Sequence, residues 1–119
     1  MERGDTIAAI ATGLTDSGIG IVRISGPASI DVGNGIFRSP SGREILEKAE
    51  SHRFYYGFVV DREEGFEIDE VLAVVMRAPR SFTGEDTVEI QCHGGVLVMR
   101  KILEACLKCG ARLAEPGEF

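Results

Sequence analysis

Several features are missing from this 119-residue sequence, and each absence argues against a class of protein. No apolar run approaches the ~20 residues that span a bilayer, and the charged start at Met1–Asp5 does not lead into a signal-peptide core. Bases are outnumbered, with 13 Lys and Arg against 19 Asp and Glu, and the net charge of -6 opposes broad binding to nucleic-acid phosphates. We therefore predict a soluble, cytoplasmic protein with no membrane association and no basic RNA-binding face.

Catalytic signatures are also missing. The sequence has no G-x-x-x-x-G-K-[ST] loop for a nucleoside triphosphate, and Gly18 and Gly20 lack the third glycine and the helix of a dinucleotide-binding fingerprint. Strand packing is the favoured interpretation of these two glycines. With two histidines in the chain and no partner near His52 in sequence, no Ser-His-Asp set can be assembled, so no catalytic residue is predicted.

Cysteines are few and odd in number. Three cysteines without a secretory signal indicate reduced thiols, so no disulfide is expected. Cys92, His93, Cys106 and Cys109 formally supply enough ligands for a tetrahedral zinc ion. The spacing opposes a metal site because Cys106 and Cys109 lie on a helical pattern rather than on a turn. Buried structural cysteines are favoured, and a small Cys/His zinc hydrolase is kept as an alternative.

The composition that is present, 44% hydrophobic and 27% charged residues, predicts one domain over residues 1–119 with a single two-layer core. Apolar periodicity and turn residues predict a ββαβββα order followed by a short strand. The predicted elements are strands at Thr6–Thr12 and Gly18–Ser25, a helix from Pro27 to Phe37, strands at His52–Asp61, Asp69–Ala78 and Thr87–Cys92, a helix at Val96–Cys109 and a strand at Ala111–Ala114. The fold class is α+β, with helices on one face of a mixed β-sheet.

Two connecting stretches are strongly polar. Ser39–Glu50 carries Pro40 and Gly42, followed by a short charged run that is compatible with a helix. It is the most linker-like part of the chain, although it is too short to divide domains. Arg62–Glu67 is a charged turn that joins two strands into a hairpin, and Asp61–Glu70 contains six acids and one base. We interpret this acidic cluster as a solvated hairpin tip.

Two strands carry the candidate site residues. In Thr87–Cys92, alternation turns Val88, Ile90 and Cys92 toward the core and leaves Thr87, Glu89, Gln91 and His93 on a wholly polar face. In Gly18–Ser25 both faces are largely apolar, which predicts a central strand, and Arg23 is the exception. An unpaired guanidinium there costs several kcal/mol, so Arg23 needs a carboxylate or a rim position.

The polar group from Phe82 to Gly95 is the best candidate site. It contains the turn Thr83–Asp86, Glu89, and a helix start at Gly94–Gly95 whose free N–H groups suit an anionic or carbonyl group. The Glu89 carboxylate is a natural acceptor for an amidine-like edge with two parallel N–H donors, as in guanine or a pterin. The alternative is an ordinary solvent-facing strand edge with a turn.

One sheet face also lacks cover. Helices on one side leave the other side exposed, and strands that are apolar on both sides indicate that a second subunit or domain packs there.

Five segments in order resemble the N-terminal domain of the tRNA modification GTPase family MnmE, also called TrmE. The segments are Asp5–Ala9, Gly18–Gly26, Ser81–Asp86, Val88–Gly95 and Gly110–Phe119. The resemblance covers nearly the whole chain and implies a folate-binding domain similar to the glycine-cleavage T-protein. The domain is half the size of that protein, so two copies pair as a homodimer to complete the fold.

The ligand that the resemblance implies is a one-carbon tetrahydrofolate, typically 5-formyltetrahydrofolate, bound at or near the dimer interface. By position, Arg23 and Glu89 match the folate-contacting residues of the family. We assign Glu89 to the pterin amidine edge and Arg23 to an oxygen or carboxylate of the folate. A pure oligomerisation module without ligand is the alternative.

The resemblance also implies a longer parent protein. This parent continues into a helical domain with an inserted G domain, hydrolyses GTP with potassium and magnesium, and works with its partner MnmG. Together they modify the wobble uridine of certain tRNAs, with the folate donating a one-carbon unit and the tRNA held by the complex rather than by this domain. The chain is then a non-catalytic fragment.

Overall fold

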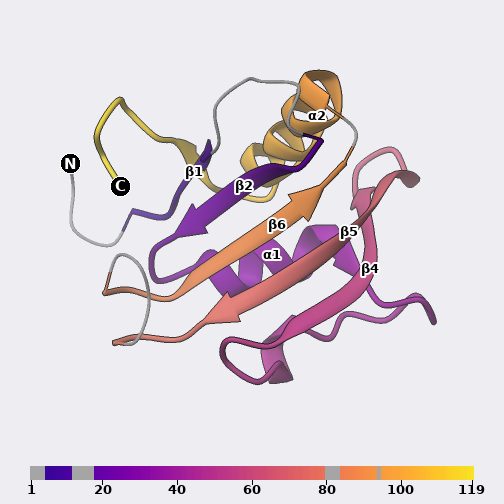
Figure 1. The fold of residues 1–119 in the computed structure, drawn as a ribbon, viewed down its shortest axis with the longest axis horizontal. Coiled ribbons are helices and arrows are strands. Elements are labelled where there is room, and N and C mark those ends of the chain that lie inside the picture. Colours follow the sequence, from indigo (N-terminus) through magenta and orange to yellow (C-terminus); the bar gives the residue numbers. More distant parts are fainter. Residues whose placement is uncertain (1–4, 12–17, 80–83, 94) are drawn as a thin grey trace.

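The computed structural model describes residues 5–11, 18–79, 84–93 and 95–119, which form a seven-stranded mixed sheet and two α-helices (Figure 1). The elements are β1 (Ile7–Ile10), β2 (Gly20–Ser25), α1 (Ser29–Ile36), β3 (Phe37–Arg38), the 3₁₀ helix η1 (Leu46–Lys48), β4 (Phe54–Asp61), β5 (Phe66–Met76), β6 (Thr87–Cys92), α2 (Gly95–Lys108) and β7 (Arg112–Leu113). The spatial order is β3-β4-β5-β6-β2-β1-β7, and every pair is antiparallel except β1 with β7. The predicted α+β class and mixed sheet are confirmed.

Both helices pack on one face of the sheet (Figure 1). The core between them contains Val22 and Ile24 of β2, Ile36 of α1 and Ile102 of α2, all fully buried. At Gly20 the helix comes very close, since a Cβ atom there would lie 2.2 Å from the Met99 sulfur of α2. This contact confirms the packing interpretation for Gly20. The interpretation is wrong for Gly18, which precedes β2 and where a Cβ atom would meet no described neighbour within 4 Å. Within the described residues, no helix is long and apolar enough to cross a membrane.

The two strands that carry the candidate site lie as predicted. β6 has the predicted limits, and Val88, Ile90 and Cys92 are fully buried. β2 lies between β1 and β6, so it is an internal strand.

The interpretation of Ser39–Glu50 as a linker is wrong. Leu46 of η1 and the following Ala49 are buried in the same core. Leu46 also donates its backbone N–H to the Asn34 side-chain oxygen at 3.1 Å, and Gly33 of α1 leaves room for the leucine side chain. Two apolar residues within a charged run were enough to fold this stretch back onto α1. η1 lies in the part of this stretch that the sequence marks as helix-compatible, whereas the two-residue strand β3 was not predicted.

The hairpin prediction is correct, but β5 begins at Phe66, three residues before the predicted start, so the turn is short. The solvated interpretation holds for Glu63 and Glu64, which are exposed, and fails for Asp61, which is buried. Asp61 Oδ1 accepts the backbone N–H groups of Glu63 at 3.0 Å and Glu64 at 2.9 Å. Its Oδ2 accepts a hydrogen bond from Lys108 Nζ at 3.1 Å, which ties the hairpin to the end of α2.

We expect this contact to make folding stability pH-dependent. The backbone N–H of Glu64, together with Lys108, holds the pKa of Asp61 below its usual value. A carboxyl group whose pKa is lower in the folded state stabilises the fold above its unfolded pKa, about 3.9, and loses that effect as pH falls through the folded pKa. Asp61→Asn should therefore lower the free energy of unfolding at pH 7, and the difference from wild type should shrink at pH 3.

Urea denaturation at both pH values measures this difference. Glu63→Gln is the matched control. The Glu63 side chain is exposed and its carboxylate lies 3.9 Å from Lys108 Nζ, which is farther than that of Asp61, so this variant should have little effect on stability. A difference for Asp61→Asn that stays constant with pH would contradict the assignment.

Candidate functional site

The two predicted site residues meet across β2 and β6. Arg23 and Glu89 are directly opposite in the register of the two strands. Arg23 Nε and Nη2 lie 2.8 and 2.7 Å from Glu89 Oε2, and the side chains are only 17% and 13% exposed. Of the two alternatives predicted for Arg23, a carboxylate partner or a rim position, the structure shows the first, and Glu89 is that carboxylate.

The ion pair belongs to a row of residues that crosses the sheet on the face away from the helices. Residues paired on adjacent strands share a face, and Arg23 alternates with the core residues Val22 and Ile24. The members of this row are Ala9, Arg23, Glu89, Val74 and Phe54. The charged pair thus has apolar neighbours on both sides.

The next row on this face is also mostly apolar. Its members are Ile21, Gln91, Leu72 and Tyr56. The polar face predicted for this one strand is correct at Glu89 and Gln91 of β6, and the neighbouring strands contribute mostly apolar residues to the same face of the sheet. Thr87, predicted on the same face, is fully buried. Alternation identifies which residues of one strand share a face, whereas the neighbours come from strands distant in sequence.

This open face, defined here as the two rows together with Ile19 and His93, exposes large apolar side chains. Leu72 is 39% exposed and Tyr56 is 49% exposed, and both helices lie on the opposite face of the sheet (Figure 1). A hollow of about 360 Å³ lies here, bordered by Ile19, Tyr56, Leu72 and the polar groups of Glu70, Gln91 and His93. The face combines apolar area with a few polar groups, as small-molecule sites do.

Glu89 retains capacity to accept hydrogen bonds. Both contacts from Arg23 go to Oε2, and no described residue donates to Oε1. A carboxylate with a free acceptor on a half-buried face can take an N–H donor of a ligand while its charge stays partly compensated.

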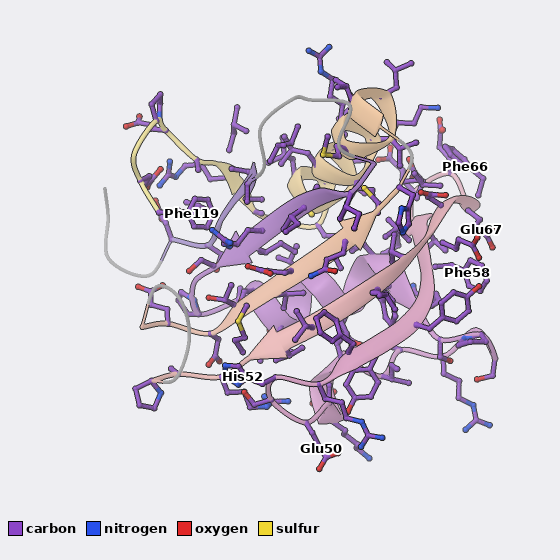
Figure 2. All side chains as sticks on the ribbon, viewed as in Figure 1. Glu50, His52, Phe58, Phe66, Glu67 and Phe119 are labelled. Atoms are coloured by element: carbon purple, nitrogen blue, oxygen red, sulfur yellow. The ribbon has the colours of Figure 1, made fainter. Side chains whose placement is uncertain are left out.

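Phe119 adds an aromatic ring to the Arg23 side of the site. The Arg23 guanidinium carbon lies 5.9 Å from the ring centroid, a cation–π distance, and Figure 2 shows Phe119 beside β1 and β2. Sequence reasoning did not connect these residues because they lie near opposite ends of the chain. The only signal was that both belong to segments of the same family resemblance.

The remaining residues of the predicted polar group either lie outside the described residues or make structural contacts. Phe82, Thr83 and Gly94 lie outside the described residues. Asp86 joins neighbouring loops, since its Oδ1 accepts the backbone N–H of Ala78 at 2.8 Å and its backbone carbonyl accepts the Ser29 hydroxyl at 2.8 Å. Its carboxylate therefore has a structural partner in the backbone of Ala78.

The cysteines have the environment of structural residues. Cys92 and Cys106 are buried thiols, and burial raises the pKa of Cys106 to about 12. His93 Nδ1 lies 3.0 Å from the Gly18 carbonyl oxygen. Among the described residues, no group of three or more His, Cys, Asp or Glu is arranged to hold a metal ion, so the zinc-hydrolase alternative gains no support.

Comparisons with known proteins identify one kind of relative. Residues 6–119 match the family described as the GTP-binding protein TrmE N-terminus. The chain is 57% identical over 115 residues to the tRNA modification GTPase MnmE of Lachnoclostridium phytofermentans, and 57% over 117 residues to that of Geobacter metallireducens. It is 48% identical over 115 residues to that of Bacillus subtilis. Each match covers 97% of this chain, which spans about a quarter of the length of these curated relatives (24–25%).

Proposed function

The chain belongs to the TrmE N-terminal domain family, and from this premise we propose that it binds a reduced one-carbon folate and pairs with a second copy of itself. The ligand is of the 5-formyltetrahydrofolate type. The observation that carries the proposal is the Arg23–Glu89 pair, half-buried at the centre of an apolar sheet face.

The chemistry of the pair suits this ligand class. A pterin ring presents an amidine-like edge with two parallel N–H donors, which a carboxylate accepts well, and Glu89 Oε1 has capacity for such a donor. A folate also carries carboxylate and carbonyl oxygens, which suit the guanidinium of Arg23. In the protein itself, Arg23 holds the Glu89 carboxylate in position on the sheet.

The apolar area of the open face supports pairing with a second copy. Exposed Leu72, Tyr56 and Phe54 on one contiguous sheet surface favour removal from water, at about 25 cal/mol for each Å² of apolar surface buried. A second copy offers an identical apolar face and the same compensated ion pair, so a symmetric contact leaves no unpaired charge at its centre.

Leu72→Glu is expected to weaken dimerisation at least tenfold, because it places two like charges near one another across a symmetric apolar contact. Sedimentation velocity over a concentration series measures the change. Leu97→Glu is the matched control, since Leu97 is 72% exposed on α2, and this variant should dimerise like wild type. A wild-type protein that stays monomeric, or a Leu72→Glu variant that stays dimeric, would contradict pairing through this face.

Titration calorimetry with 5-formyltetrahydrofolate tests ligand binding separately. The proposal expects saturable binding, which depends on Arg23 and Glu89. A dimer without measurable affinity would favour the alternative, a pure oligomerisation module.

For the longer protein we propose the role carried by the names of its relatives, tRNA modification by a GTPase. GTP, potassium and magnesium act in a G domain outside this chain, in the cytoplasm and together with MnmG. The folate supplies the one-carbon unit for the wobble uridine of the tRNA, which the complex holds. This chain contributes the folate and dimer contacts and is not itself catalytic.

A further inference from the structure

The C-terminal segment Ala114–Phe119, called the strap below, lies along β1 beside the proposed site. Two backbone hydrogen bonds anchor the chain at the start of the strap: Arg112 N–H donates to the Thr6 carbonyl at 2.8 Å, and Ala114 N–H donates to the Ala8 carbonyl at 2.9 Å. Beyond Ala114, the strap borders an open hollow of about 320 Å³ together with Ala9 and Ile10. Ala9 is the register neighbour of Arg23, so the strap borders the row that contains the ion pair.

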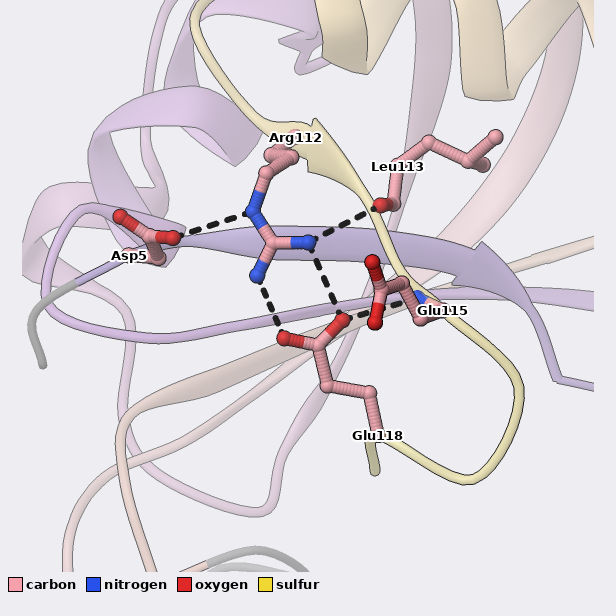
Figure 3. A network of polar contacts seen from close by, with 5 residues as sticks. All are labelled: Asp5, Arg112, Leu113, Glu115 and Glu118. Carbon is pink, nitrogen blue, oxygen red and sulfur yellow. Dashed lines mark hydrogen bonds and ion pairs between the residues drawn. The ribbon is translucent and has the colours of Figure 1, made fainter. Parts of the chain in front are cut away.

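A single arginine fastens the far end of the strap. Arg112 Nε donates to Asp5 Oδ2 at 3.0 Å, while Nη1 donates to Glu118 Oε1 at 3.2 Å and Nη2 pairs with Glu118 Oε2 (Figure 3). The Glu118 side chain is only 10% exposed, and its Oε1 also accepts the backbone N–H of Glu115 at 2.8 Å. A bidentate arginine–carboxylate pair of this kind determines the orientation of the two side chains as well as the distance between them.

The next residue after Glu118 is Phe119, whose ring lies over Arg23. Because Arg112 holds both oxygens of Glu118, it also limits where the Phe119 ring can lie. Arg23 is thus held from two sides, by the Glu89 carboxylate in the sheet and by the Phe119 ring on the strap.

We propose that Arg112 is a positioning residue for the ligand site, which fastens the strap to Asp5 and Glu118 so that Phe119 holds the Arg23 guanidinium in its binding position. The inference rests on the proposed folate-binding function. Arg112 makes no contact with Arg23 itself in this role; its effect passes through Glu118 and Phe119.

The test combines Arg112→Gln, Arg112→Lys and Glu118→Gln with two measurements on each protein. Hydrogen exchange of the strap amides reports whether the strap is fastened, and titration with 5-formyltetrahydrofolate reports affinity. We expect Arg112→Gln and Glu118→Gln to lose strap protection and to bind about tenfold more weakly, in line with the loss of a cation–π contact and of pre-organisation. Arg112→Lys keeps the charge without the bidentate geometry, so its strap protection and its affinity should lie between those of wild type and of Arg112→Gln.

Arg53→Gln is the matched control, since it removes another arginine–glutamate pair, that with Glu50, which is well exposed. It should change neither measurement. The Arg112 variants could lose affinity because they fold poorly. Glu118→Gln does not alter Arg112 or its backbone hydrogen bond to Thr6, so it tests the fastening role independently.

Strap protection that survives in both Gln variants would overturn the fastening role. A released strap with unchanged affinity would overturn the positioning role. If the wild-type protein does not bind the folate at all, the proposed function fails and the positioning role with it, whereas the exchange measurement still decides whether Arg112 fastens the strap.

Discussion

Glu89→Ala should weaken binding of 5-formyltetrahydrofolate by more than a hundredfold. The substitution removes a charged acceptor, and hydrogen bonds to charged groups are worth about 1.5–3 kcal/mol each. It also leaves Arg23, which is 17% exposed, without its carboxylate partner in the sheet. About 1.4 kcal/mol corresponds to tenfold in affinity. The lost hydrogen bond to the ligand and the lost Glu89 contact that holds Arg23 together account for the expected change. Titration calorimetry measures the dissociation constant directly.

The register of β2 and β6 offers a matched control. Because Arg23 and Glu89 are directly opposite, the double variant Arg23→Glu/Glu89→Arg keeps an ion pair at the same place with the two ends exchanged. We expect this variant to recover the stability lost in either single charge variant but not the ligand affinity. A swapped protein that binds like wild type would mean that the pair serves only the fold, and unchanged binding by Glu89→Ala would place the ligand elsewhere.

Gly26→Ala is expected to lower the free energy of unfolding by about 3 kcal/mol or more. Gly26 follows β2 with a φ of +131°, a region that L-residues rarely adopt. A Cβ atom there would also lie 2.6 Å from the Asp5 carbonyl oxygen and 2.7 Å from the Thr6 Cα. Both are backbone atoms next to β1, so relieving the contact requires moving the strand that borders Arg23. Urea denaturation gives the change in unfolding free energy.

Gly65→Ala separates the cost of the unfavourable φ from the cost of the close backbone contact. Gly65 has a φ of +77° in the hairpin turn, but a Cβ atom at this position would have no described heavy atom within 4 Å apart from those of its chain neighbours. This variant should lose only about 1 kcal/mol, the usual cost of an unfavourable φ. Equal losses in the two variants would contradict the close approach at Gly26.

Local patterns were sufficient where an element is defined by its own residues. The period-2 alternation of β6 predicted its limits and its core residues Val88 and Ile90, and the helical stripe predicted α2 to within one residue at each end. The same patterns failed where single residues are buried although the segment around them is highly charged. Leu46 within a charged run and Asp61 within an acidic cluster are both buried because partners from α1 and α2 lie beside them.

By itself the sequence determined the fold class, the family, and the requirement that Arg23 have either an acidic partner or a rim position, since an arginine on an apolar strand face is costly alone. Only the tertiary structure decided which acid meets that requirement, which apolar side chains surround the pair, and that Phe119 and the Arg112 network lie beside it. Strand register depends on hydrogen bonds between segments far apart in the chain, and these bonds decide which side chains meet. A pattern within one segment has no access to that information.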